Sequence, residues 1–126
     1  MKTTAFLSIL LLLISTNQAF AYGSSSSKKS CKKPQFSQFN PKHLATIRSG
    51  STFDFIASAN TIPDSVEVKI KNQPLAIQVN KESNHYRIRG KLPTDLKASY
   101  ARIAIQAFAA KKCRGNGGWL VNISEE

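Results

Sequence analysis

The stretch Val66-Glu67-Val68-Lys69-Ile70-Lys71 alternates apolar and charged residues without a break. In an extended strand, successive side chains point to opposite faces, so this alternation places three aliphatic side chains on one face and three charged ones on the other. Such a segment is typical of a strand that has one face against a core and the other in water. The stretch therefore predicts a protein built from one-sided β-sheets.

The same period of two recurs along the chain after Pro34. Five further segments carry apolar side chains at alternate positions, namely Phe53, Phe55 and Ala57; Leu75, Ile77 and Val79; Tyr86, Ile88 and Leu92; Ala101, Ile103, Ile105 and Ala107; and Trp119, Val121 and Ile123. Turn-forming residues separate these segments at 60–64, 72–74, 81–84, 93–99 and 115–118. The pattern predicts six or seven short strands and no helix of comparable length after residue 21.

Short strands at this spacing favour two antiparallel sheets packed face to face, and a small barrel is the alternative. Leu92-Pro93, a polar link, and then Tyr100 at the start of an alternating strand resemble the tyrosine corner of immunoglobulin-like and fibronectin type III domains. The resemblance implies an all-β fold, a single antiparallel immunoglobulin-like β-sandwich of about seven strands. It implies architecture alone, because a shared fold does not confer a function.

The first 21 residues have the features of a secretory signal peptide. Lys2 precedes an apolar run at residues 6–14 that only Ser8 interrupts, and Ala19-Phe20-Ala21 is a small-x-small cleavage signal. The run is shorter than the ~20 apolar residues that a membrane-spanning helix needs. We therefore expect cleavage after Ala21 and a soluble protein that is periplasmic or secreted.

Two domain boundaries follow from the composition of the rest of the chain. Residues 22–33 contain five serines and four lysines and few apolar side chains, which predicts a flexible basic arm. Residues 34–126 carry the strand pattern and form the predicted β-sandwich domain. The whole chain has 18 Lys and Arg against 7 Asp and Glu, a formal net charge of +11, which indicates an anionic partner.

The chain has two cysteines, Cys31 and Cys113, and in an oxidising compartment we expect them to form a disulfide. Both lie among basic residues and no acidic ones. The bridge would gather seven cations, Lys28, Lys29, Lys32, Lys33, Lys111, Lys112 and Arg114. We call this predicted anion-binding cluster the cationic pole. Two cysteines and two isolated histidines lack the spacing of metal ligands, so no metal site and no small-molecule cofactor are predicted.

A second basic row consists of His85, Arg87, Arg89 and Lys91, which alternate with apolar or small residues. Spaced by two, these side chains would project from one side of a strand and could follow a polyanion. The alternative is a solvated sheet face on which lysine and arginine guard against edge pairing. The aromatic residues fall mostly on the predicted inward rows, so the sequence does not predict a platform on which bases stack.

These features favour a monomeric, exported, non-catalytic binding protein whose cationic pole takes an anionic polymer or a membrane surface. A second hypothesis is a structural or accessory immunoglobulin-like module that docks another exported protein, by strand addition or through a hairpin turn at Gly115-Asn116-Gly117-Gly118. A third is a secreted basic nuclease that uses His43 and His85 in acid-base catalysis. The spacing of the two histidines does not predict that they meet, so no catalytic set is predicted.

Overall fold

The computed structural model describes residues 31–125. The predicted signal peptide at 1–21 and most of the predicted basic arm at 22–33 lie outside this part of the chain. The described residues form nine β-strands and two short 3₁₀ turns. Their bounds are β1 Phe36–Asn40, β2 Thr46–Arg48, β3 Thr52–Ser58, η2 Pro63–Ser65, β4 Glu67–Ile70, β5 Gln73–Pro74, β6 Ile77–Glu82, β7 His85–Lys91, β8 Ser99–Ala109, η3 Ala110–Lys112 and β9 Cys113–Ser124.

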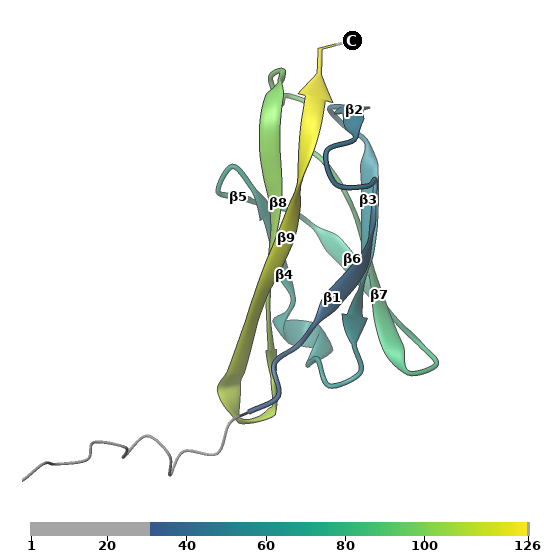
Figure 1. Ribbon diagram of the computed structural model, residues 1–126, viewed down its shortest axis with the longest axis vertical. Helices are drawn as coiled ribbons and strands as arrows, with labels where there is room; N and C mark the ends of the chain where they lie inside the picture. Colours follow the sequence, from purple (N-terminus) through teal and green to yellow (C-terminus); the bar gives the residue numbers. More distant parts are fainter. Residues whose placement is uncertain (1–30, 126) are drawn as a thin grey trace, which may run out of the picture.

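The strands form two sheets, which confirms the predicted β-sandwich. One sheet has the order β1-β3-β7-β6 and the other the order β2-β9-β8-β4-β5. All neighbours pair antiparallel except β2 and β9, which run parallel. Figure 1 shows that the described chain begins at the end of the sandwich where β8 turns into β9, while the C-terminus lies at the opposite end. Among the described residues, no helix is long and apolar enough to cross a membrane.

The core lies between the two sheets and contains most of the apolar side chains that the alternation places inward. Val68, Ile70, Ile88, Ile103 and Val121 are all nearly inaccessible to solvent. Burial of an aliphatic side chain of this size contributes about 1.5–3 kcal/mol to folding. The predicted inward rows of the central strands are therefore confirmed.

An aromatic cluster closes one side of the core around Trp119. The ring of Phe39 stacks on Trp119 with centroids 4.7 Å apart, and Phe53 and Phe55 approach it edge to face. The Trp119 Nε1–H donates a hydrogen bond to the carbonyl oxygen of Pro41 at 2.7 Å. Because its one polar group is paired, the indole can be buried without an unsatisfied donor.

The strands β1 and β2 were not among the segments predicted from alternation. In β1, Phe36 and Phe39 both pack against the core although they are three residues apart. The pairing with β3 shifts between Ser37 and Asn40, and Gln38 has a φ of 52°. This bulge inserts an extra residue, which breaks the period of two that identifies a strand in the sequence. β2 is only three residues long, too short to show a period.

The hairpin turn predicted at Gly115-Asn116-Gly117-Gly118 was wrong, because these residues lie inside β9 and the turn is η3. A Cβ at Gly115 would lie 2.7 Å from the carbonyl oxygen of Pro34, and one at Gly117 would lie 2.7 Å from Cδ2 of Phe36. Glycine is present here so that the segment entering β1 can lie close against β9. Glycines with this role resemble a turn signal in the sequence.

The predicted tyrosine corner was also wrong. Tyr100 is 63% exposed and stands on the outer face of β8, whereas its neighbour Ala101 is buried. A tyrosine corner requires a hydroxyl bonded back to the backbone near the E–F corner. Because side chains alternate in a strand, the burial of Ala101 places Tyr100 on the solvent side.

Candidate anion-binding site

The disulfide between Cys31 and Cys113 is confirmed and joins the start of the described chain to the β8–β9 hairpin. The two Cα atoms are 5.8 Å apart, and the bridge spans 82 residues. Cys113 is the first residue of β9 and is buried, while Cys31 is exposed. The bridge thereby brings two basic segments from opposite ends of the sequence to one end of the sandwich.

The segment after Cys31 is held against the sandwich by its backbone. Asn60 Nδ2 donates to the carbonyl oxygens of Lys32 and Lys33, at 2.9 and 3.4 Å. The Gln35 N–H donates to Ser58 Oγ at 2.9 Å. Because the backbone makes these contacts, both lysine side chains remain exposed to solvent.

The facing segment is the three-residue turn between the paired residues Ala109 and Cys113. Within it, Lys111 and Lys112 have φ values of 65° and 55°. This left-handed conformation costs a residue with a Cβ roughly 1–2 kcal/mol. Strain of this kind persists only where the surroundings impose it, here the paired strands on both sides and the disulfide at Cys113. The turn presents the two lysine side chains at the tip of the hairpin.

The five described members of the cationic pole are all exposed, namely Lys32, Lys33, Lys111, Lys112 and Arg114. The ion pairs found in residues 31–125 lie elsewhere, within the β1-β3-β7-β6 sheet. The two remaining predicted members, Lys28 and Lys29, lie outside the described residues. Five cations with no carboxylate partner within ion-pair distance in the described part of the chain give this end a positive potential that an anion can use.

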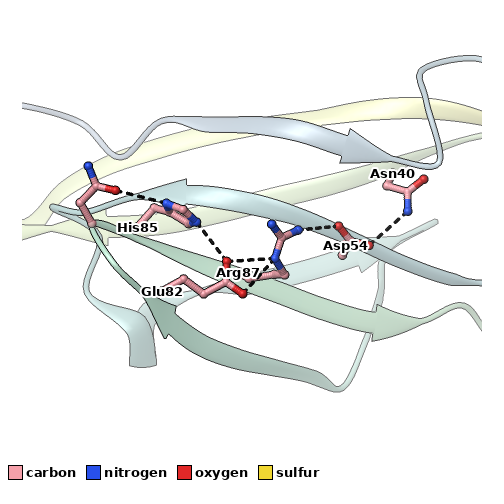
Figure 2. Close-up of polar contacts among 6 residues, drawn as sticks. Asn40, Asp54, Glu82, His85 and Arg87 are labelled. Carbon is pink, nitrogen blue, oxygen red and sulfur yellow. Dashed lines mark hydrogen bonds and ion pairs between the residues drawn. The ribbon is translucent and has the colours of Figure 1, made fainter.

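The second basic row lies on β7, which has β3 on one side and β6 on the other. It is therefore a central strand, so the basic row lies on a sheet face and does not guard an edge. Figure 2 shows that part of the row is already paired with acidic side chains. Arg87 donates to Asp54 Oδ1 and Glu82 Oε2, both at 3.1 Å, and His85 Nε2–H donates to Glu82 Oε1 at 3.1 Å.

This network pairs two of the four residues of the β7 row, His85 and Arg87, with carboxylates. Hydrogen bonding from His85, followed by that from Arg87, lowers the pKa of Glu82 below its ordinary value. Arg89 and Lys91 stay exposed beside an open hollow of about 500 Å³ between β3, β6 and β7. The row therefore offers an external anion less charge than its four basic residues suggest.

The outer face of β8 carries side chains that sequence reasoning missed. Tyr100, Arg102 and Phe108 alternate there with the buried row of Ala101 to Ala109. The signal was present, because the same alternation that places alanine and isoleucine inward places these residues outward. It was overlooked because Tyr100 was assigned to a tyrosine corner.

The two histidines lie in different parts of the sandwich. His43 Nδ1 accepts a hydrogen bond from the Leu120 N–H of β9 at 3.3 Å, whereas His85 belongs to β7 in the other sheet. No group of three or more histidine, cysteine or acidic side chains within residues 31–125 is arranged to hold a metal ion. The structure thus brings the basic segments at the pole together but leaves the two histidines apart, His43 in the turn before β2 and His85 on β7.

Comparison with known proteins identifies the fold. No protein-family profile and no curated protein sequence matches this chain. Among solved structures, it is similar to CopC from Methylosinus trichosporium OB3b, with a TM-score of 0.55 and 6% identity over 74% of this chain and 95% of that one. PcoC, a methionine-rich copper resistance protein from Escherichia coli, gives a TM-score of 0.51 and 13% identity over 74% and 100% of the two chains. The GspB Siglec domain gives 0.53 and 16%, over 75% and 59%. At these identities the likeness shows the fold alone, an immunoglobulin-like β-sandwich.

Proposed function

We propose that this chain is an exported, non-catalytic binding protein whose cationic pole captures an anionic polymer or membrane surface. The observation that supports the proposal is the disulfide, which gathers basic segments from opposite ends of the chain. The lysine and arginine side chains there are exposed and have no acidic partner within ion-pair distance among residues 31–125. Binding follows from counterion release and phosphate or carboxylate contacts, with little dependence on polymer sequence.

Salt dependence tests this mechanism. The logarithm of the affinity for a single-stranded polyanion should fall linearly with the logarithm of the salt concentration, with a slope of roughly −0.7 for each phosphate neutralised. The double variant Lys111→Gln with Lys112→Gln removes two charges at the pole and should make the slope shallower by about 1.4. Fluorescence anisotropy with a labelled oligonucleotide at several salt concentrations measures both quantities.

A matched control removes the same net charge from the other end of the sandwich. Arg48 pairs with Ser124 at the end of β9, and Lys97 lies in the loop beside Ser124. The double variant Arg48→Gln with Lys97→Gln should leave the slope close to that of the unaltered protein. Equal losses in the two double variants would show that net charge alone drives binding, and would refute a localised pole.

A second candidate function is a module that docks another exported protein by strand addition. β6 has one neighbour in its sheet and is six residues long, so one row of its backbone groups has no strand partner within the described sheet. Docking of this kind depends on backbone hydrogen bonds and apolar contacts, so it should respond weakly to salt. A Val79→Pro substitution in β6 would abolish it and leave capture at the pole unchanged.

We do not extend copper binding from these structural neighbours to this chain. PcoC is described as a methionine-rich copper resistance protein, whereas this chain has one methionine, Met1. Its two histidines lie apart, because His43 is in a turn against β9 and His85 is on β7 of the other sheet. The same separation argues against acid-base chemistry by a histidine pair, so neither copper binding nor nuclease activity is our proposal.

A further inference from the structure

The outer face of the β8–β9 ribbon presents aromatic and basic side chains together. On β8 the outward row includes the exposed Tyr100 and Arg102 at one end and the half-buried Phe108 at the other, and on β9 Arg114 pairs across from Phe108. Tyr100 is 63% exposed, and Arg102 on the same row is exposed as well. The face therefore has features of a binding surface.

These side chains form two stations, each an aromatic ring beside an arginine. At the first, next to the cationic pole, the Arg114 guanidinium lies 5.4 Å from the centroid of the Phe108 ring. At the second, Tyr100 and Arg102 are adjacent on the same row of β8. The Arg102 guanidinium carbon lies 3.3 Å from where a Cβ at Gly118 would be, so this side chain lies along the sheet surface.

The surface between the stations carries small or uncharged side chains. Ala104 pairs with Gly118, and Gln106 pairs with Asn116, so small or neutral side chains occupy the middle of the ribbon. The eight steps along β8 from Phe108 to Tyr100 span about 27 Å at the rise of an antiparallel strand. This length suits several units of an extended polymer.

The two outer faces of the sandwich differ in whether their basic side chains form ion pairs. On the β7 face, Asp54 and Glu82 pair with the basic residues. On the β8–β9 face, no ion pair is found within the described residues, although Glu67 lies nearby on β4. The arginines of the β8–β9 face are thus free to contact an external anion.

We propose that this face, continuous with the cationic pole through Arg114, binds single-stranded nucleic acid. This inference rests on the proposed function and specifies its ligand. Phosphates contact the lysines of the pole and the arginines, while bases stack on Tyr100 and on the Arg114 guanidinium over Phe108. Stacking surfaces of this kind distinguish nucleic acid from anionic polymers that have no flat rings. Every base has a π-face on which it can stack, so the affinity should depend little on the base sequence.

Two oligonucleotides of the same length separate stacking from phosphate contacts. We would compare an oligothymidylate of about 15 nucleotides, within the range of known single-strand site sizes, with an abasic strand of equal length. The unaltered protein should bind oligothymidylate more tightly. Tyr100→Ala should weaken that complex about five-fold or more, as loss of one stacking contact does, and should leave binding of the abasic strand unchanged.

A charge-matched pair of variants tests the position of the site. Arg102→Gln and Arg89→Gln each remove one exposed arginine, from the β8–β9 face and the β7 face respectively. The first should weaken binding of oligothymidylate and the second should not. Circular dichroism and thermal melting check that each variant is folded.

The outcomes separate this inference from the proposed function. Equal binding of the two strands, with no effect of Tyr100→Ala, would overturn stacking and leave capture at the pole standing. Tighter binding of a sulfated polysaccharide or an anionic vesicle than of oligothymidylate, independent of Tyr100, would also overturn it. Failure of every polyanion to bind at low salt would overturn the proposed function itself.

Discussion

Removing the disulfide by Cys31→Ala with Cys113→Ala should lower the free energy of unfolding by about 4.5 kcal/mol. The bridge spans 82 residues, and in the chain-entropy model a loop of that length removes about 15 cal/mol/K from the unfolded chain. Alanine is the appropriate replacement because Cys113 is buried, and serine would add a hydroxyl without a partner. A domain of this size has a total stability of roughly 5–15 kcal/mol, so the loss should be a large part of it.

Guanidinium unfolding measures this change. Trp119, the single tryptophan, is buried against Phe39, so its fluorescence reports loss of the core. At roughly 4–8 °C per kcal/mol, the melting temperature should fall by about 20 °C or more. The unaltered protein unfolded in the presence of a reductant is the control and should match the double variant. A loss below about 1 kcal/mol would refute the entropic argument, since it would mean that the bridge hardly restricts the unfolded chain.

Two further predictions concern the packing of β9 and the network on β7. Gly115→Ala should destabilise the protein by about 1–3 kcal/mol, because the new Cβ would lie 2.7 Å from the backbone oxygen of Pro34; an unchanged denaturation midpoint would contradict this close approach. The pKa of Glu82 is lowered, first by the hydrogen bond from His85. A carboxyl with a lowered pKa stabilises the fold above its unfolded pKa of about 4.3, and this contribution is lost as the pH falls through the lower folded value. Thermal melting from pH 7 to pH 2 should therefore show a loss that Glu82→Gln reduces; identical profiles would contradict the network.

Alternation predicted the central strands because burial of one face leaves a local signature. In β8, the inward row of alanine and isoleucine is read directly from the sequence, and its burial is confirmed. The edge strands β1 and β2 leave no such signature. β1 contains a bulge at Gln38 and β2 has three residues, so neither shows a regular period. The first 21 residues predicted export to an oxidising compartment and therefore a disulfide, and the structure contains this disulfide.

The candidate site was predicted in part. The sequence predicted a disulfide with basic neighbours, and the structure places five of the seven cations of the pole at that end. It did not predict that acidic side chains on β3 and β6 would form ion pairs with Arg87 of the β7 row. Asp54 is 33 positions away from Arg87 along the chain, so only the pairing of strands brings the two together.

The sequence by itself determined which side chains of each central strand face the core, because the direction of a side chain in a strand depends on its position relative to its neighbours. It also determined the excess of positive charge and, through its two cysteines, where two basic segments meet. The tertiary structure decided which of those charges are free, because neutralisation depends on acidic residues that other strands supply. It also decided that the glycines of β9 admit a crossing segment and do not form a turn, since close approach of distant backbone is a property of packing.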